Sequence, residues 1–346
     1  MSMKIFEVET ESEHESVRFC VDTAANYRGI IAIHSTRLGP AVGGTRFWHY
    51  ASDDEAITDA LRLSRGMTYK NALAGLSFGG GKSIIIGDRK TPHREEIFRA
   101  HGRFVETLGG RYITAEDVGT STADMDYVLL ETNHVAGLAG RDGDPSPLTA
   151  HGVFRAIQAS AKYRWGSDEL AGRRVAVQGL GHVGYRLSKE LHDAGAHLIV
   201  ADIDDERVRQ AVAEFDAEAA SPEDIYGVRA DIFAPCALGG IINDRTIPQL
   251  RVEIVAGAAN NQLLDAIHGD RLAEHNILYA PDYVANAGGI INGGIELQGW
   301  SREFSFAKVR GIYDTVLMVF EMARAEGIPT HRAADRLAEQ RLHAVH

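Results

Sequence analysis

Two lysines and an aspartate have the types and spacing needed for chemistry on an amine. Lys70 and Lys82 lie twelve positions apart, and Asp117 follows later in the chain. Oxidising an amine to an imine and hydrolysing the imine requires one cation that holds the substrate carboxylate and a second group that is neutral part of the time. Burial beside another cation lowers a lysine pKa and suits that second role. Lys70 and Lys82 fit this division, and Asp117 is placed to carry protons.

The sequence around Lys82 predicts a tight strand entrance. Three glycines, Gly79–Gly81, precede the lysine, and the apolar run Ser83–Ile86 reads as a buried strand. Glycines allow close backbone approach, so we expect a space for a ligand here. The Gly-Lys-Ser string is not a phosphate-binding P-loop, because position 76 is Leu where that loop requires Gly and because a strand follows the lysine.

A second motif predicts a dinucleotide-binding fold. The strand-like run 173–178 leads directly into the glycine-rich turn Gly179–Gly184 and then into a helix pattern. Asp202 ends the next strand, eighteen residues after Gly184. In this arrangement the first glycine allows a tight turn, the second admits a pyrophosphate, and the third lets helix and strand pack closely. The helix N-terminus favours the anion.

Asp202 favours NAD over NADP. Its carboxylate can accept hydrogen bonds from ribose hydroxyls and would repel a 2′-phosphate, although Arg207 close by leaves NADP open. Three loops, 236–240, 257–261 and 282–289, follow later strands. The carboxyl ends of the strands face the ligand in such a sheet, so we expect these loops near the nicotinamide.

Alternating strand and helix patterns predict a two-domain α/β protein. In the first half we expect a helix over 16–25, strands near 29–35 and 111–117, a glycine-rich connection over 38–46 that leads into a second short strand, and helices over 52–70, 94–108 and from Ser121. In the second half, Ser221 is expected to cap a further helix, and 304–342 to be helical. Residues 140–147 are rich in glycine and proline, which interrupt helices and strands, so we expect the domain boundary there. The first domain would span 1–145 and the second 146–335. A C-terminal tail over 336–346 would return to the first domain.

Composition excludes several classes of protein. The chain of 346 residues is 45% hydrophobic and carries a net charge of −12, which argues against nucleic acid as a partner. Two cysteines and fifteen scattered histidines provide neither a disulfide framework nor ligand-spaced pairs, so no metal is expected. The sequence does not start like a signal peptide, so we expect a cytoplasmic protein. It also has no apolar run long enough to span a bilayer, so we expect no membrane partner.

Several strings resemble the amino-acid dehydrogenase family that includes leucine, valine, phenylalanine and glutamate dehydrogenases, most of all its shorter leucine/phenylalanine branch. They cover nearly the whole chain and lie at 38–46, 60–82, 114–119, 147–153, 175–184, 233–240, 256–263 and 280–289. The resemblance implies an N-terminal α/β substrate and oligomerisation domain, a doubly wound Rossmann NAD-binding domain and an active site in the cleft. It also implies a homo-oligomer, either a dimer or an octamer.

The resemblance further implies residue roles. Lys70 would bind the substrate carboxylate with help from backbone at Gly43 and Gly44, and Lys82 would be the general base with Asp117 as its partner. Either Asn260 or Asn261, with Asn260 preferred, would fix the nicotinamide or the substrate. The expected cofactor-binding residues are Gly179, Gly181, His182, Val183, Gly184, Asp202, Thr149, Cys236, Ala237, Asn260 and Asn261. Cys236 is expected to pack or to offer backbone, not to act as a nucleophile.

The substrate pocket implied by the resemblance is apolar. Val42, Ala115, Ile290 and Gly293 would line it, and Gly293 stands where leucine-type relatives carry a larger residue. The extra volume would admit an aromatic side chain, so branched-chain and aromatic substrates both stay open, whereas glutamate is not expected. A methylene in such a pocket changes binding by only about 1–3 kcal/mol, so overlapping activities are expected.

The favoured hypothesis is therefore reversible, NAD-dependent oxidative deamination of an apolar L-amino acid to a 2-oxo acid and ammonia. A hydroxy-acid dehydrogenase is a second possibility, but the His, Asp and Arg set usual for that class does not stand out. A non-catalytic NAD-binding sensor or scaffold is a third, and it would be favoured by loss of Lys82 or Asp117, both of which are present.

Overall fold

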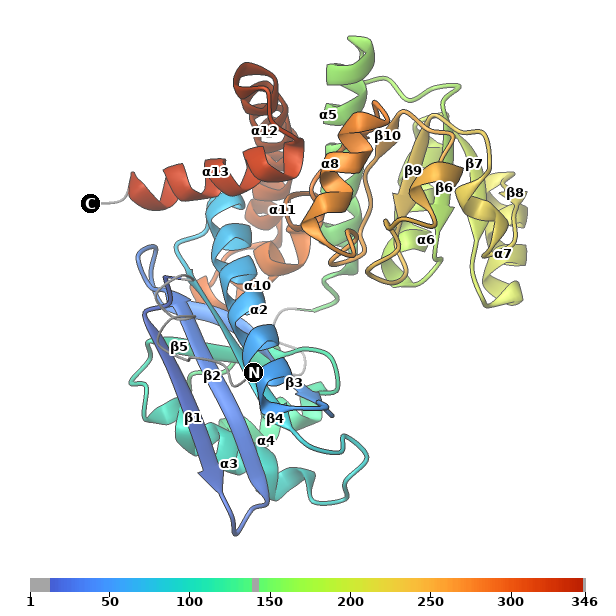
Figure 1. The fold of residues 1–346 in the computed structure, drawn as a ribbon. Helices are drawn as coiled ribbons and strands as arrows, with labels where there is room; N and C mark the ends of the chain where they lie inside the picture. The colour runs from blue at the N-terminus through green and yellow to red at the C-terminus, as the bar shows by residue number, and fades with distance from the viewer. Residues whose placement is uncertain (1–12, 139–142, 345–346) are drawn as a thin grey trace. The chain divides into compact units, whose positions relative to one another are not determined.

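The computed structural model describes residues 13–138 and 143–344, and its chain divides into two compact units. The first unit comprises the described residues up to Gly143 together with Gly293–Trp300 and the chain from Ala338. The second comprises Asp144–Asn292 and Ser301–Leu337. Each unit is built around its own sheet (Figure 1). No helix among the described residues is both long and apolar enough to cross a membrane.

The sheet of the first unit is mixed and has the strand order β1-β2-β4-β3-β5. Its strands are β1 (Ser16–Asp22), β2 (Tyr27–Ser35), β3 (Ala41–Trp48), β4 (Gly79–Ile86) and β5 (Tyr112–Glu116). The central strand β4 pairs antiparallel with β2 and parallel with β3. Because successive side chains of a strand point to opposite faces, Ile84 and Ile85 enter two different cores.

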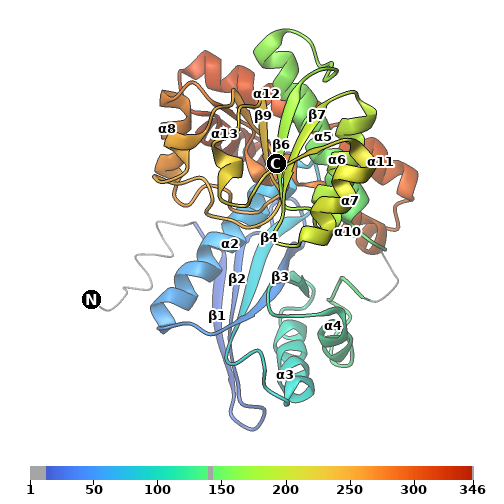
Figure 2. The same ribbon diagram turned by 90° about the vertical axis from the view of Figure 1, so that its right-hand side faces the viewer.

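Helices cover both faces of this sheet (Figure 2). Helix α2 (Asp53–Leu73) packs its apolar positions on the face that carries Ile84, and Ser52 caps it by accepting a hydrogen bond from the backbone N–H of Glu55. Helices α3 (Arg94–Glu106) and α4 (Thr122–Leu129) pack on the opposite face. The predicted capping box between Ser121 and Asp124 is present at the start of α4.

Two sequence expectations for the first unit are wrong. Residues Ser16–Asp22 form the edge strand β1 and not a helix, because the apolar residues Val17, Phe19 and Val21 recur at every second position, which is the period of a strand. The glycines Gly79–Gly81 do not precede the strand but begin it, so Lys82 lies in the middle of β4 and not at its entrance.

The sheet of the second unit is parallel and has the order β11-β10-β9-β6-β7-β8, which confirms the expected doubly wound fold. Its strands are β6 (Arg174–Gln178), β7 (His197–Ala201), β8 (Glu218–Ala219), β9 (Ile232–Pro235), β10 (Ile254–Val255) and β11 (Leu278–Tyr279). Strand order reverses between β6 and β9. In such sheets a ligand binds outside the carboxyl ends of the strands at this position.

The remaining helices are α5 (Ser146–Trp165), α6 (His182–Asp193), α7 (Asp205–Phe215), α8 (Ala266–Glu274), α9 (Asp282–Ala285), α10 (Gly288–Gln298), α11 (Arg302–Arg310), α12 (Ile312–Glu326) and α13 (Thr330–His343). Two expectations need correction here. The helix predicted after Ser221 is only a short 3-10 turn, Asp224–Tyr226. The loop predicted over 282–289 is largely helical, because α9 occupies its first half and α10 begins at Gly288.

Candidate functional site

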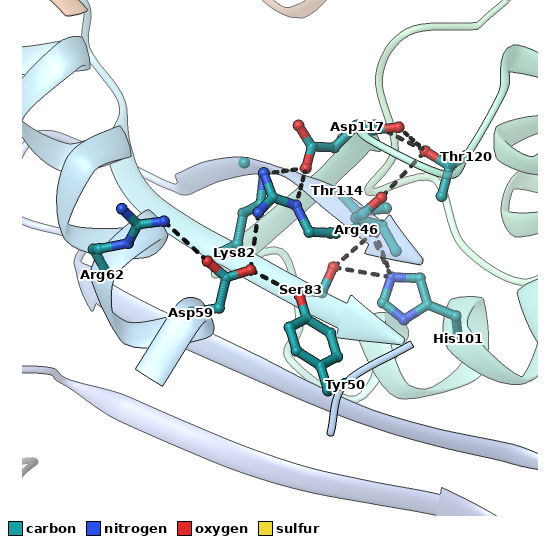
Figure 3. A network of polar contacts seen from close by, with 12 residues as sticks. Arg46, Tyr50, Asp59, Arg62, Lys82, Ser83, His101, Thr114, Asp117 and Thr120 are labelled. Carbon is teal, nitrogen blue, oxygen red and sulfur yellow. Dashed lines mark hydrogen bonds and ion pairs between the residues drawn. The ribbon is translucent and has the colours of Figure 1, made fainter. Parts of the chain in front are cut away.

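Lys82 is buried on the α2 face of the first sheet. It pairs in register with Ala32 of β2, and only 4% of its surface is exposed. Its Nζ lies 2.9 Å from Asp117 Oδ2 (Figure 3). Burial lowers the pKa of Lys82 below its ordinary value, and the nearby Asp117 carboxylate opposes that shift. A lysine with a lowered pKa can exchange protons with a substrate.

Asp117 stands one residue beyond β5 and accepts two cations at one oxygen. Its Oδ2 is contacted by Lys82 and by Arg46, whose Nε lies 3.1 Å away. Its backbone N–H donates to the Thr120 hydroxyl, which fixes the turn that follows the strand. Burial acts to raise the pKa of Asp117, but the Lys82 and Arg46 cations outweigh it and hold the pKa below its ordinary value. The carboxylate is therefore kept ionised.

Arg46 links Asp117 to a second carboxylate, Asp59 of α2. Arg46 Nη1 donates to Asp59 Oδ2 at 2.9 Å, and the Tyr50 hydroxyl donates to the same oxygen at 2.7 Å. A surface cleft of about 560 Å³ in the first unit is lined by Arg46, Trp48, Tyr50, Glu55, Thr58, Asp59, Arg62 and Val118. Arg46 and Asp59 were not among the residues singled out from sequence. Strand alternation was the available signal for Arg46, since it shares a face of β3 with Gly44.

The glycines around Lys82 allow close packing of neighbouring protein atoms. A Cβ on Gly80 would stand 2.0 Å from the backbone nitrogen of Thr68 in α2, and one on Gly43 would stand 1.7 Å from the carbonyl oxygen of Gly81. At Gly44 the added atom would meet the Asp117 side chain at 2.8 Å. The close approach expected from the glycines is therefore real, but it brings helix and strand backbones together around Lys82.

Lys70 lies in the last turn of α2 and is half-buried. Its neighbour Asn71 donates from Nδ2 to the carbonyl oxygen of Gly79 at 2.6 Å, which ties the end of α2 to the start of β4. The structure thus brings the segments that carry Lys70 and Lys82 together. Val42 is buried in β3, and Ala115 is half-buried in β5, opposite Gly44 in the register.

A buried polar network lies on the opposite face of the sheet from Lys82. The Thr45 hydroxyl hydrogen-bonds to Ser83 at 2.7 Å and to Nε2 of His101 at 3.0 Å. Tyr112 contacts the Ser83 hydroxyl and donates to the carbonyl oxygen of Gly43. Full burial lowers the pKa of His101 to about 3, so its ring is neutral. These bonds tie β3, β4 and β5 together beside Lys82 and Gly43.

In the second unit, the glycine-rich turn has the features expected of a pyrophosphate cradle. Gly179 has a φ of +95°, a left-handed conformation that favours glycine. A Cβ on Gly184 would stand 1.9 Å from the carbonyl oxygen of Gly179, so this glycine allows α6 to pack on the turn. At Gly181 an added Cβ would meet no atom within 4 Å. Gly181 is also the N-cap of α6, which begins with His182 and Val183.

Asp202 follows β7 and supports the same turn. Its Oδ2 accepts from the backbone N–H of Leu180 at 2.6 Å, and its Oδ1 accepts from Asp204 at 2.9 Å. Each carboxylate oxygen retains acceptor capacity for a ribose hydroxyl. Two large apolar side chains are exposed near this edge: Ile203 is 93% exposed and Leu238 is 75% exposed. Arg207 forms an ion pair with Asp204.

Cys236 and Ala237 line the inner side of the turn. The backbone nitrogen of Ala237 stands 2.8 Å from the position of a Cβ on Gly179. Burial raises the pKa of the Cys236 thiol to about 12, so the sulfur keeps its proton. A thiol that keeps its proton is a weak nucleophile.

Asn260 is oriented by residues that the sequence analysis did not assign. Asn286 donates from Nδ2 to Asn260 Oδ1 at 2.8 Å. The fully buried Gln262 donates to the carbonyl oxygens of Gly257 and Ala259 and shapes the same loop. Asn261 has a positive φ of 51° and is exposed, and its carbonyl oxygen accepts from the backbone N–H of Gly240 at 2.7 Å.

The remaining predicted residues lie on α5 and α10. Thr149, in the first turn of α5, would be 3.3 Å from a Cβ on Gly289, so the starts of the two helices are close. Ile290 and Gly293 follow on α10, and both are half-buried. A Cβ on Gly293 would meet no atom within 4 Å, whereas one on Gly294 would stand 2.4 Å from the Trp300 ring. Within the described ranges, no group of His, Cys, Asp and Glu residues is arranged to hold a metal.

Comparison with known proteins places this arrangement in a family. A family model described as the Glu/Leu/Phe/Val dehydrogenase dimerisation domain matches residues 11–134. A second, described as glutamate/leucine/phenylalanine/valine dehydrogenase, matches residues 200–334.

Individual relatives match over nearly the whole chain. Leucine dehydrogenase from Geobacillus stearothermophilus is 55% identical over 99% of this chain and 94% of its own length. Valine dehydrogenase from Streptomyces virginiae is 48% identical over 95% of this chain and 94% of its own. The crystal structure of L-tryptophan dehydrogenase from Nostoc punctiforme aligns with a TM-score of 0.90 and 46% identity, over 99% of each chain. The chain therefore belongs to the glutamate/leucine/phenylalanine/valine dehydrogenase family of amino-acid dehydrogenases.

Proposed function

We propose that this protein catalyses the NAD-dependent, reversible oxidative deamination of an apolar L-amino acid to the 2-oxo acid and ammonia. The observation that carries the proposal is the buried ion pair between Lys82 Nζ and Asp117 Oδ2, in a chain of the amino-acid dehydrogenase family. Burial lowers the pKa of Lys82, so this lysine gives up its proton at a lower pH than an exposed lysine does.

The proposed roles follow the charges of the first unit. Lys70 binds the substrate carboxylate, assisted by backbone at Gly43 and Gly44. Loss of a hydride from the substrate leaves an iminium carbon, and water adds to that carbon as neutral Lys82 takes one of its protons. The resulting carbinolamine loses ammonia when its hydroxyl proton is removed and its nitrogen is protonated. Asp117, bonded to Lys82, relays these protons.

The residues of the second unit fit NAD. The open space beside Gly181 at the N-terminus of α6 suits a pyrophosphate, because unpaired backbone N–H groups gather there. The Asp202 carboxylate suits free ribose hydroxyls and disfavours a 2′-phosphate. Ile203 and Leu238 offer exposed apolar surface to the adenine. His182, Val183, Thr149 and the loops at Cys236–Ala237 and Asn260–Asn261 complete the proposed contacts. NAD supplies the hydride acceptor.

The proposed substrate is an apolar amino acid, either branched-chain or aromatic. Val42, Ala115, Ile290 and Gly293 are small or apolar, and no atom lies within 4 Å of where a Cβ on Gly293 would stand. The relatives named for leucine, valine and tryptophan span the range of side chains that such a pocket would admit. We further propose a homo-oligomer, since the family model of the first unit is described as a dimerisation domain.

The test is NADH formation, followed by absorbance at alkaline pH, with NAD and single L-amino acids. The panel contains Leu, Val, Ile, Phe, Trp and Glu, together with 2-hydroxyisocaproate as a hydroxy-acid control. We expect turnover on one or more apolar amino acids and none on the hydroxy acid or on Glu. If NAD binds but no amino acid is oxidised, the proposal is wrong and a sensor function is favoured.

A further inference from the structure

The Lys82–Asp117 pair is not isolated, because one oxygen of Asp117 is shared with a second cation. Asp117 Oδ2 lies 2.9 Å from Lys82 Nζ and 3.1 Å from Arg46 Nε. Arg46 in turn is held by Asp59, so the charges alternate from Lys82 to Asp117 to Arg46 to Asp59 (Figure 3). We propose that Arg46 and Asp59 are positioning residues that set the geometry and the charge balance of the Lys82–Asp117 pair. This inference rests on the proposed function.

The geometry of Arg46 suits this role. Its planar guanidinium presents Nε to Asp117 and Nη1 to Asp59, so one rigid group fixes two carboxylates in defined directions. Asp59 is fixed as well, since its Oδ2 also accepts from the Tyr50 hydroxyl at 2.7 Å and its Oδ1 faces Arg62 at 3.3 Å. The side chains of Arg46 and Asp59 are only 18% and 14% exposed, so water screens the pair weakly.

These contacts join three separate elements around the reacting lysine. Arg46 comes from β3, Asp59 from α2 and Asp117 from the turn after β5. Arg46 and Asp117 are 71 positions apart in the sequence. If the link were removed, the Asp117 carboxylate would be held by Lys82 alone, and its Oδ2 would no longer be shared with a fixed cation.

The charge balance at Lys82 follows from all the groups that face it. Burial lowers the pKa of Lys82, and the Arg46 cation acts in the same direction, whereas the Asp117 and Asp59 carboxylates act to raise it. Tyr50 and Arg62 stand behind Asp59, and Lys70 lies on the same helix α2. On the other face of the sheet, Ser83 contacts His101, which is buried and neutral. Arg46 and Asp59 therefore shift the pKa of Lys82 in opposite directions.

Two neutral substitutions should consequently move the pH–rate profile in opposite directions. In Arg46→Gln the nearby cation is lost and Asp117 interacts with Lys82 alone. The pKa of Lys82 should therefore rise, and the low-pH limb of the kcat profile for deamination should move to higher pH. In Asp59→Asn the distant carboxylate is lost while Arg46 keeps its bond to Asp117, so the limb should move to lower pH. We expect shifts of about half a pH unit or more, because unit charges this close in a half-buried site interact by more than thermal energy.

The experiment measures kcat and kcat/KM from pH 7 to 11 with NAD and the best amino acid of the panel as probe. Arg89→Gln is the matched control, because it also removes one arginine from the first unit. The Arg89 guanidinium stacks on the Trp48 ring. Arg46→Lys keeps the charge and loses the two-armed guanidinium, so its limb should stay in place while kcat falls. Thermal unfolding establishes that each variant is folded. Should Arg46→Gln fail to fold, the downward shift in Asp59→Asn still decides the question.

Opposed shifts in the two variants, with an unmoved limb in Arg89→Gln, would support the inference. A merely structural role would lower kcat at every pH without moving the limbs in opposite directions. If Arg46→Gln and Asp59→Asn both keep wild-type turnover and the limbs of their pH–rate profiles do not move, the inference is overturned and the proposed function still stands. An inactive wild-type protein would instead overturn the proposed function, and the inference with it.

Discussion

Lys82 combines deep burial with two neighbouring charges of opposite sign. Its ammonium group is bonded to Asp117, and Arg46 shares the same carboxylate oxygen. Burial is the largest influence on its pKa and lowers it. A neutral lysine is required for deamination in the proposed mechanism, so the rate should fall as the pH drops through the pKa of Lys82. An exposed lysine would impose that loss at a higher pH.

Replacement of Lys82 by Ala should nearly abolish turnover and leave NAD affinity within a few-fold of wild type. Loss of a general base commonly costs about 10²–10⁴-fold in rate, and Lys82 belongs to the first unit, whereas the proposed NAD residues belong to the second. Lys189→Ala is the control, since Lys189 forms an exposed ion pair with Asp193. Steady-state kinetics and NAD titration are the measurements. A large loss of NAD binding in Lys82→Ala would contradict the assigned role.

Asp202→Asn should weaken discrimination against NADP. The amide oxygen keeps one of the two hydrogen bonds that Asp202 accepts from the backbone N–H groups of Leu180 and Asp204, and the negative charge that repels a 2′-phosphate is lost. We expect the ratio of kcat/KM for NAD to that for NADP to fall by about tenfold or more, which corresponds to about 1.4 kcal/mol. Asp193→Asn removes an equivalent charge from α6 and should leave the ratio unchanged. An unaltered ratio in Asp202→Asn would mean that another residue reads the ribose.

At the scale of elements, the turn from β6 into α6 gives its glycines different tasks. Gly184 is surrounded by protein, whereas Gly181 faces open space at the N-terminus of α6. The same substitution at these two positions should therefore have different consequences, one for folding and one for binding.

Gly184→Ala should destabilise the second unit, because the new Cβ would stand 1.9 Å from the carbonyl oxygen of Gly179. Gly181→Ala should fold with a melting temperature close to wild type and lose more than about tenfold in NAD affinity, because the added methyl occupies the proposed pyrophosphate space. Thermal unfolding and NAD titration separate the two effects. Wild-type NAD binding by Gly181→Ala would show that the pyrophosphate lies elsewhere.

The polar network under the first sheet should make stability depend on pH. His101 has a pKa of about 3 in the fold, against an ordinary value of 6.5, so the unfolded chain binds an extra proton between these values. The contribution of His101 to stability is thus complete above pH 6.5 and is lost as the pH falls toward 3. The loss amounts to at most about 1.4 kcal/mol per pH unit.

His101→Asn should remove this contribution. The difference in urea-unfolding free energy between wild type and His101→Asn should shrink as the pH is lowered from 6.5 to 4.5. His49→Asn, which removes an exposed histidine of the same unit, is the control for losing one such side chain. Parallel stability curves for wild type and His101→Asn over this range would contradict the assigned burial and charge of His101.

At the scale of the whole molecule, each unit has its own sheet and its own hydrophobic core. The first unit carries Lys82 and Asp117, and the second carries the glycine-rich turn and Asp202. The proposed reaction therefore uses residues of both units.

The intact protein should behave as a homo-oligomer. Light scattering at micromolar concentration should give a mass that is a multiple of the 37.7 kDa chain, because the first unit matches a family model described as a dimerisation domain. The mass should not change with ionic strength if the interface is mainly apolar. A species of 37.7 kDa over the whole concentration range would contradict this proposal.

The sequence by itself determined the features that depend on neighbouring residues. The strand, glycine-rich turn, helix and Asp202 of the second unit are contiguous, so their spacing predicts the fold and the direction of the sheet. The capping residues Ser52 and Ser121 likewise predict where α2 and α4 begin. Elsewhere local patterns mislead, because the residues of strand β1 favour a helix and those of α9 and the start of α10 favour a loop.

Only the tertiary structure decided what surrounds Lys82. The glycines before it predict close approach, but only packing determines that the approaching groups are Thr68 of α2 and the backbone of neighbouring strands. The links from Arg46 to Asp117 and Asp59 join residues from three elements, and no local period relates them. The physical reason is that burial, strand register and helix docking set the distances between charges, and these distances, not the residue types alone, set the proton affinity of a buried lysine.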